Sequence, residues 1–302
     1  MSKWLTQHHV PDFEYITYIV NTMKKIYPFI SVDTIGYSWA GRNIYSISIG
    51  KAENSVIYTA ATHASEWLTS LVLLRFVEDL CMHVRENKRF SQIDIAKHLK
   101  EKGAVFIPVV NPDGVEISLS GTQSARAFAQ TASAINGDKS SALWNANARG
   151  VDINHNFNAG WEKLKKMEIE SGITEAAPRQ YGGAFAESEL ETFALSELCR
   201  NRNFSSAMAL HSQGEEIFYT YDGKVPDKAE LMAKVLSAFS GYTLVEQNGL
   251  ASHGGFKDWF INEFNRPAFT VEIGKGENPL ALEELDPIYE KIKEMLLLFL
   301  LF

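Results

Sequence analysis

The chain has 302 residues, of which 45% are hydrophobic and 22% are charged. These proportions are close to those of ordinary globular proteins and argue against a disordered chain. The length is compatible with one domain spanning residues 1–302, because α/β enzymes often reach this size as a single unit. A formal net charge of −8 argues against nucleic acid and anionic membrane surfaces as partners.

The termini and the cysteines carry no sign of secretion or of membrane insertion. The first nine residues lack the apolar core and the cleavage site of a secretory signal, so we expect a cytoplasmic protein, with release or another export route left open. The apolar run 295–302 is much shorter than the about 20 residues that span a bilayer, so we expect no membrane insertion. Cys81 and Cys199 are expected to be buried, reduced thiols.

The first third of the chain alternates between helical and strand patterns. It predicts, in chain order, a helix at 13–26, a hairpin of strands at 31–37 and 43–49, a strand at 55–60, a helix at 66–85 and a strand at 104–110. The last of these strands ends at Asn111-Pro112-Asp113-Gly114, which is a strong turn signal. The polar segment 115–186 is then expected to be a long irregular region, which in a compact domain usually lines a functional site.

The rest of the chain continues the alternation. It predicts, in order, a helix at 187–202, a strand at 205–210, a helix at 226–240, a short strand at 242–246, a helix at 254–264, a strand at 268–273 and a helix at 280–301. Strands that alternate with helices are typical of an α/β fold. We therefore predict a mixed, mostly parallel, twisted sheet that helices cover on both faces.

A histidine and a carboxylate stand three positions apart at a strand-to-helix junction. His63 and Glu66 follow the apolar run 56–60 and open a helical pattern, so both side chains can turn towards one point in space. A third candidate, His211, closes the apolar run 207–210. Two histidines and a glutamate are a ligand set that holds catalytic zinc and leaves one position for water. We predict one zinc ion per chain, bound by these three residues.

Glu272 is the candidate catalytic base. It closes the apolar run 267–271, and a carboxylate at the end of a buried strand is costly unless metal, hydrogen bonds or chemistry compensate for its desolvation. We predict that Glu272 takes a proton from the attacking water and passes it to the leaving amine. The alternative is a structural carboxylate paired with Lys275.

The order of these residues resembles that of the zinc carboxypeptidase (funnelin) family. The resemblance runs from about Tyr37 to the C-terminus and is carried, in chain order, by His63-x-x-Glu66, by Gly-Val-Asp-Ile-Asn-His-Asn-Phe at 150–157, by His211-Ser212 and by Glu272. Segments 154–156 and 210–217 are most similar to the bacterial γ-D-glutamyl-L-diamino-acid peptidases, which cut cell-wall peptides. The resemblance implies a zinc carboxypeptidase-like α/β fold and zinc as the cofactor.

The resemblance also implies roles for four residues near position 150. Asp152 is expected to hold a ring nitrogen of His63, or else only to cap a turn. Arg149 is expected to stabilise the developing oxyanion, or else to form a surface salt bridge. Asn154 and His155 are expected to contact substrate, and His155 stands where digestive carboxypeptidases place an arginine that clamps the terminal carboxylate.

A second departure from the digestive enzymes lies in segment 250–259. The mobile tyrosine of the family falls on Leu250, so that phenol is missing, and His253 either substitutes for it in part or is an ordinary loop histidine. The position that sets side-chain preference in the family falls on Lys257. A cation there implies a carboxylate on the substrate, whereas the alternative is an exposed helix lysine.

Together these features predict a zinc amidase whose partner is a cell-wall peptide. The predicted reaction is hydrolysis of γ-D-glutamyl-diaminopimelate bonds in peptides derived from the cell wall. One alternative is a general metallocarboxypeptidase, which Asn154 favours and His155 opposes. Another is a catalytically silent domain that binds muropeptides, which Glu272 argues against because a binding module has no need of a base.

Overall fold

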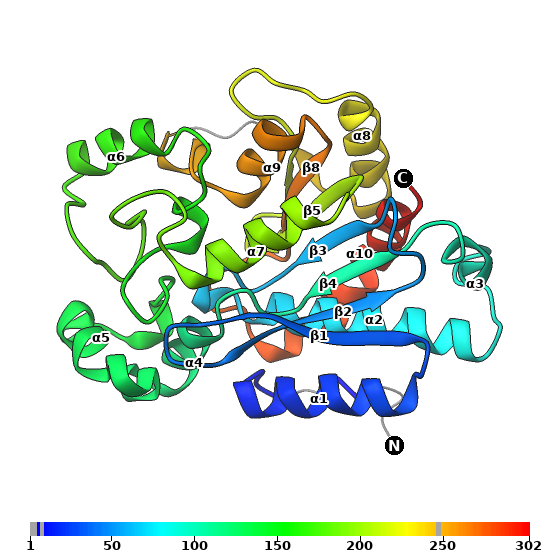
Figure 1. The fold of residues 1–302 in the computed structure, drawn as a ribbon, viewed down its shortest axis with the longest axis horizontal. Helices are drawn as coiled ribbons and strands as arrows, with labels where there is room; N and C mark the ends of the chain where they lie inside the picture. The colour runs from blue at the N-terminus through cyan, green and yellow to red at the C-terminus, as the bar shows by residue number, and fades with distance from the viewer. Residues whose placement is uncertain (1–4, 7–8, 246–248) are drawn as a thin grey trace.

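A computed structural model describes residues 5–6, 9–245 and 249–302, so part of the N-terminal stretch and residue 246 of the predicted strand 242–246 lie outside the described residues (Figure 1). The strands are β1 (Ile30–Tyr37), β2 (Asn43–Ile49), β3 (Val56–Thr59), β4 (Ala104–Ile107), β5 (Ser206–His211), β6 (Glu216–Phe218), β7 (Thr243–Leu244) and β8 (Ala268–Glu272). The helices are α1 (Phe13–Ile26), α2 (Leu68–Arg85), α3 (Ile95–His98), α4 (Pro112–Ser120), α5 (Ala129–Asn136), α6 (Trp161–Glu170), α7 (Leu190–Asn201), α8 (Ala229–Ser240), α9 (Phe256–Phe264) and α10 (Leu285–Leu301).

The described strands form one mixed sheet in the order β1-β2-β4-β3-β5-β8-β6-β7. The four central strands, β4, β3, β5 and β8, run parallel to one another, whereas β2 pairs antiparallel with β4 and β6 pairs antiparallel with β8. The predicted mixed, mostly parallel sheet is confirmed. Parallel pairing brings the carboxyl ends of β3, β5 and β8 to the same edge, where open α/β sheets bind their ligands.

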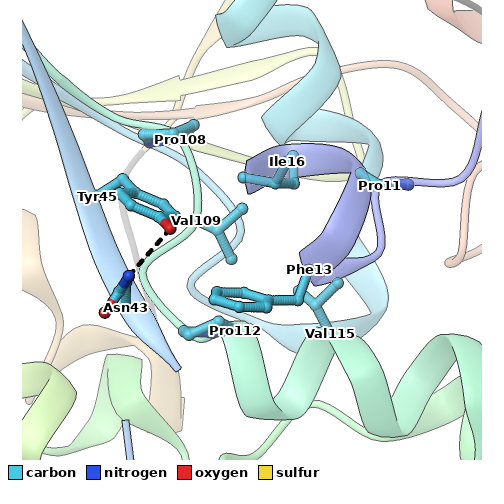
Figure 2. Close-up of a pocket in the computed structure, with 9 residues that line it drawn as sticks. All are labelled: Pro11, Phe13, Ile16, Asn43, Tyr45, Pro108, Val109, Pro112 and Val115. Carbon is cyan, nitrogen blue, oxygen red and sulfur yellow. Dashed lines mark hydrogen bonds between the residues drawn. The ribbon is translucent and has the colours of Figure 1, made fainter. Parts of the chain in front are cut away.

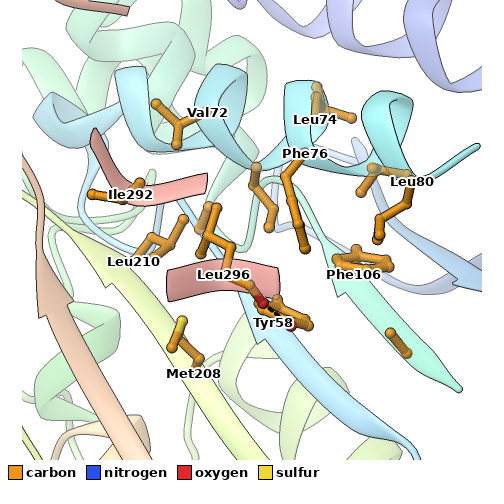
Figure 3. Close-up of a cluster of buried hydrophobic side chains, with 14 of the residues drawn as sticks. Tyr58, Val72, Leu74, Phe76, Leu80, Phe106, Met208, Leu210, Ile292 and Leu296 are labelled. Atoms are coloured by element: carbon orange, nitrogen blue, oxygen red, sulfur yellow. Dashed lines mark hydrogen bonds between the residues drawn. The ribbon is translucent and has the colours of Figure 1, made fainter. Parts of the chain in front are cut away.

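Helices cover both faces of the sheet, as the sequence predicted. Residues of α1, α2, α8 and α10 belong to one hydrophobic cluster, and residues of α7 and α9 belong to another on the opposite face (Figure 1). Figure 3 shows the centre of the first cluster, where Phe76 of α2 and Leu296 of α10 pack over Tyr58 and Phe106. Tyr58 Oη donates a hydrogen bond to Leu296 O at 2.8 Å, so this phenol is satisfied inside the core.

A small apolar hollow lies where α1 packs against β2 (Figure 2). Phe13 and Ile16 of α1 line it together with Tyr45 of β2 and Val109. Its volume of about 10 Å³ leaves room for a single water molecule at most, so it holds no substrate. It marks the seam where α1 is packed onto the sheet rather than a functional site.

The prediction of an irregular region over 115–186 is wrong in part. Asn111 begins a helix rather than closing a turn, because its side-chain oxygen accepts a hydrogen bond from Gly114 N at 2.9 Å and Pro112 occupies the first turn. Helices α5 and α6 follow in the same segment. α6 buries only Leu164 and Glu168, so few apolar residues mark its helical period. Figure 1 shows α4, α5 and α6 gathered at one end of the sheet.

The remaining expectations about the chain's interior agree with the structure. The other predicted helices and strands are present, with ends displaced by a few residues. Cys81 and Cys199 are both buried and free, as predicted. Among the described residues, no helix is long and apolar enough to cross a membrane.

Candidate active site and metal centre

His63, Glu66 and His211 meet at the carboxyl edge of the central strands. His63 follows β3 and immediately precedes a short 3₁₀ turn, Ala64–Glu66, while His211 closes the neighbouring parallel strand β5. One ligand atom from each residue lies within 4.8 Å of the others. The two carboxylate oxygens of Glu66 lie 2.8 Å from His63 Nδ1 and 2.9 Å from His211 Nδ1. The local turn therefore brings the three predicted zinc ligands together.

The geometry of these three residues fits a tetrahedral zinc ion. The Nδ1 atoms of His63 and His211 are 3.3 Å apart, and two zinc–nitrogen bonds of about 2.0–2.1 Å at a tetrahedral angle place their nitrogens about 3.3 Å apart. Zinc takes two imidazole nitrogens and a carboxylate readily, and it leaves a fourth position for water or substrate. The zinc carboxypeptidase-type donor set predicted from the sequence is thus compatible with the side chains that the fold brings together.

Asp152 orients the first of these histidines. Its Oδ1 lies 3.2 Å from His63 Nε2, and an ionised carboxylate only accepts, so Nε2 carries the proton and Nδ1 presents a lone pair. Burial opposes this charge, but His63 and His155 together hold the pKa of Asp152 below its usual range. Asp152 also accepts hydrogen bonds from the backbone N of Asn154 and Gln180, so it orients His63 and caps a turn at once.

Asp152→Asn is expected to weaken zinc binding by about 10–100-fold, because removing an outer hydrogen-bond partner of a metal-ligating histidine typically has that effect. An amide of the same size can present its NH₂ group to His63 Nε2 and favour the wrong tautomer. Competition with a chelator of known zinc affinity measures the change. Zinc affinity equal to that of the wild type would show that Asp152 is only a turn cap.

Glu272 stands beside the metal-binding residues at the end of β8. It is paired with His211 in the register of β5 and β8, and it lines the same hollow as His63 and Glu66. Burial, followed by the charge of Glu66, raises the pKa of Glu272 well above its usual range, against the opposing effect of His63. A buried carboxylate that lines the same hollow as the predicted metal ligands is a candidate general base. The alternative, an ion pair between Glu272 and Lys275, is not formed, because Lys275 Nζ lies 3.0 Å from Glu215 Oε2.

The hollow around these groups has a volume of about 390 Å³, which suits a peptide side chain and its flanking bonds. Its walls come from the carboxyl ends of β3, β5 and β8 and the residues that follow them, from β6, from Leu250 and from the loops between α4 and α7. The lining residues are His63, Glu66, Asn145, Asp152, His155, Arg179, Gln180, Ser212, Gln213, Glu216, Phe218, Leu250, Glu272 and Asn278. Leu250 is among them, so an apolar side chain stands where the family places a tyrosine.

Arg149 does not reach this hollow. Its guanidinium stacks on Trp39, with 4.4 Å between Cζ and the ring centroid, and Nη1 lies 3.5 Å from Glu189 Oε1. These partners hold the side chain away from the lining residues, so the prediction of an oxyanion contact from Arg149 is not supported. The salt-bridge alternative is the one that the structure shows.

Arg149 pairs with the edge of a buried acidic cluster. Asn147 Nδ2 donates hydrogen bonds to Glu189 Oε2 at 2.8 Å and to Glu191 Oε2 at 3.3 Å. Glu191 Oε1 is buried and has no partner among the described residues. Burial, followed by the charges of Asp113 and Glu189, raises the pKa of Glu191 to about 8. Glu191 is therefore protonated in the folded protein at neutral pH.

Glu191→Gln is expected to make the protein more stable than the wild type above pH 8, with little difference at pH 5. The folded-state pKa lies above the unfolded value, so the unfolded state loses its proton first and wild-type stability falls as the pH rises from about 4.5 to 8. Each pKa unit is worth about 1.4 kcal/mol, so the gap should reach a few kcal/mol. Denaturant unfolding of both proteins at pH 5 and pH 9 measures it, and an equal difference at both values would contradict the assignment.

Asn154 and His155 lie on the 3₁₀ turn that follows Asp152. His155 lines the hollow, and its Nδ1 lies 3.1 Å from Gln180 O and 3.3 Å from Glu168 Oε1. Asn154 is not among the lining residues, and its Oδ1 accepts a hydrogen bond from Phe256 N at 3.0 Å. The structure thus brings His155 to the site, whereas Asn154 joins the turn to the start of α9.

Lys257 and His253 also lie outside the hollow. Lys257 is 2% exposed, its Nζ donates a hydrogen bond to Thr220 O at 2.5 Å, and it forms an ion pair with Asp258. A buried and neutralised cation cannot select a substrate carboxylate, and the alternative of an exposed lysine is wrong as well. His253 lines a separate hollow with Tyr221, whose hydroxyl lies 3.3 Å from His253 Nδ1.

Asn145, Arg179 and Glu216 are among the lining residues that were not predicted from the sequence. Asn145 lies shortly before Arg149, the residue to which the oxyanion role was assigned. Glu216 lies in the segment 210–217, which carries the family resemblance. Arg179 lies in the polar segment 115–186, whose length was the only sign that it borders a site. No periodicity or spacing in the sequence distinguishes these residues, because loops determine their positions.

Comparisons with known proteins identify the family of the chain. A family model described as zinc carboxypeptidase matches residues 16–295. The chain is 32% identical to γ-D-glutamyl-L-diamino acid endopeptidase 1 of Lysinibacillus sphaericus, covering 95% of this chain and 72% of that protein. It is 28% identical to rat carboxypeptidase B, covering 81% and 58%. The structure of bovine thrombin-activatable fibrinolysis inhibitor, in complex with tick carboxypeptidase inhibitor, matches with a TM-score of 0.74 at 20% identity, covering 97% of this chain and 96% of that one. The chain therefore belongs to the zinc carboxypeptidase family and is a zinc metallopeptidase.

Proposed function

We propose that this metallopeptidase hydrolyses the amide bond between γ-linked D-glutamate and a diamino acid, meso-diaminopimelate, in peptides derived from the cell wall. The proposal of amide hydrolysis rests on the position of Glu272, which lies beside the proposed metal ligands His63, Glu66 and His211. The similarity to a diamino acid endopeptidase over most of the chain supports the choice of bond. The replacement of the clamping arginine by His155 also favours a substrate other than an ordinary peptide C-terminus.

The residues of the site have distinct parts in this reaction. His63, Glu66 and His211 would hold the zinc ion, which when bound would supply a Lewis acid and lower the pKa of water to near neutrality. Glu272 accepts the proton of the attacking water and then delivers it to the leaving amine nitrogen, for which its position in the hollow suits it. Asp152 keeps His63 in the tautomer and orientation that binding requires.

Asn145 is placed to stabilise the negative charge that develops on the carbonyl oxygen. It lines the hollow and is 7% exposed. Its Oδ1 accepts a hydrogen bond from Ser65 Oγ at 2.5 Å, which fixes the amide, and its Nδ2 donates to no described residue. An amide donor held in this way costs little reorganisation when the oxyanion forms. Asn145 thus has the oxyanion-stabilising role that the sequence had suggested for Arg149.

The general metallocarboxypeptidase is the second candidate. The similarity to carboxypeptidase B favours it. However, among the described residues that line the hollow, Arg179 is the only lysine or arginine, and it does not occupy the position of the family's clamp. The third candidate, a silent peptide-binding domain, has no use for a base such as Glu272 beside the predicted metal ligands.

Product analysis of the zinc-loaded protein distinguishes the three candidates. Mass spectrometry of a reaction with L-Ala-γ-D-Glu-meso-diaminopimelate should show L-Ala-D-Glu and free diaminopimelate. The matched control is the same tripeptide with an α-linkage at L-glutamate. Cleavage of the control alone would establish the general carboxypeptidase, and cleavage of neither peptide by protein that carries zinc would establish the silent domain.

A further inference from the structure

Arg179 is a cation at the active site without a protein partner. Its side chain is exposed, it lines the hollow that contains Glu272, and it makes no hydrogen bond or ion pair with any described residue. Most other charged side chains in this hollow are carboxylates, namely Glu66, Asp152, Glu216 and Glu272. A substrate that brings its own carboxylates therefore meets one guanidinium there.

The backbone on both sides of Arg179 is fixed to the catalytic loops. The preceding residue, Pro178, accepts hydrogen bonds at its carbonyl oxygen from the backbone N of Asn145 and Ala146, both at 2.9 Å. The following residue, Gln180, donates its backbone N–H to Asp152 Oδ2 at 2.9 Å, and its carbonyl oxygen lies 3.1 Å from His155 Nδ1. Arg179 is thus attached to the site at its Cα, which lowers the entropic cost of ordering its side chain on a ligand.

The surroundings on the far side of Arg179 also favour an anion. Arg179 and Gln180 form the wall between the active-site hollow and a neighbouring hollow of about 530 Å³. The lining of that second hollow contains no aspartate or glutamate among the described residues. No carboxylate on this side competes with a ligand for the guanidinium.

We propose that Arg179 binds a substrate carboxylate that flanks the scissile amide, and thereby contributes to specificity. This inference rests on the proposed function. A γ-linked glutamate keeps its α-carboxylate free on one side of the scissile bond, and the diamino acid carries a carboxylate on the other side. A guanidinium matches either group with two parallel hydrogen bonds. Arg179 therefore has the role that was predicted for Lys257, namely selection of a substrate carboxylate. Lys257 itself is buried and paired with Asp258.

Three peptides identify the carboxylate. They are L-Ala-γ-D-Glu-meso-diaminopimelate, its analogue with D-isoglutamine in place of D-glutamate, and its analogue amidated at the carboxylate beside the scissile bond in the diamino acid. We expect the wild type to cut one analogue roughly 10- to 150-fold less efficiently in kcat/KM than the parent peptide, the range for a lost charge-assisted contact. Arg179→Ala should cut the parent peptide and that analogue with equal efficiency. The analogue that the wild type cuts poorly identifies the carboxylate that Arg179 binds.

Binding and control measurements complete the test. Calorimetry with Glu272→Gln and with Glu272→Gln/Arg179→Ala should show the same loss of discrimination in Kd, independent of turnover. Lys139→Ala removes a neighbouring cation outside the active-site hollow, so it should retain the wild-type preference. Arg179→Gln serves as the second variant if Arg179→Ala does not fold.

The outcomes separate this inference from the proposed function. If the zinc-loaded wild type cuts none of the three peptides, the proposed function fails and this inference fails with it. If the wild type cuts them but shows no preference against either analogue, or if the Arg179 variants keep the wild-type preference, only the role of Arg179 is overturned.

Discussion

Glu272→Gln should lower turnover by about 10²–10⁴-fold while the protein keeps its fold and its zinc. Glutamine has the same size as glutamate but cannot accept the proton of the attacking water. The proposed metal-binding atoms belong to His63, Glu66 and His211, so the substitution leaves them in place. Steady-state kinetics on the diaminopimelate tripeptide, with zinc content measured on the same preparation, tests this expectation.

Glu216→Gln is the matched control for this experiment. Glu216 faces Glu272 across the antiparallel pair of β6 and β8 and lines the same hollow, so the two substitutions each replace a carboxyl group with an amide in nearly the same place. Glu216→Gln should lower turnover far less than Glu272→Gln. A near-normal rate for Glu272→Gln, or equal losses in both variants, would show that Glu272 is not the proton acceptor.

His63→Ala and His211→Ala should each lose most of the bound zinc and reduce hydrolysis to the background rate. Either change leaves only one histidine and Glu66, and catalytic zinc sites usually have three protein ligands. Metal analysis after dialysis measures the zinc content, and wild-type protein should retain one zinc ion per chain. Circular dichroism of each variant verifies that the fold is kept.

His155→Ala is the histidine control for the metal. His155 lines the same hollow, but its ring contacts Gln180 O and Glu168 rather than the metal-binding atoms. This variant should keep its zinc. Full zinc retention by both His63→Ala and His211→Ala, or zinc loss from His155→Ala alone, would mean that the metal is bound elsewhere.

The sequence predicted those parts of the fold and site that follow from strand and helix patterns. His63, His211 and Glu272 each stand at or just past the end of a buried strand, and parallel pairing of β3, β5 and β8 brings such ends to one edge. Glu66 follows His63 by one short turn, so its approach to the same point was also local. Apolar runs are sufficient to locate these strands.

Other parts of the site depend on tertiary contacts that the patterns do not contain. Arg149 turns towards Trp39 and Glu189, which are distant in sequence, and Lys257 is buried by Thr220 and its neighbour Asp258. Trp39, Glu189 and Thr220 are absent from the local sequence around the arginine and the lysine, and the adjacent Asp258 does not by itself indicate that Lys257 is buried. Long-range contacts of this kind override the preferences of single residues.

The most direct test of the account is diffraction from crystals of the zinc-loaded protein at the zinc absorption edge. We predict one anomalous peak, coordinated by the Nδ1 atoms of His63 and His211 and by the carboxylate of Glu66, with Glu272 beside it and not bound to it. A peak at any other set of residues, or zinc coordinated by Glu272 itself, would contradict the central claim that these three residues hold the metal while Glu272 remains free to act as the base.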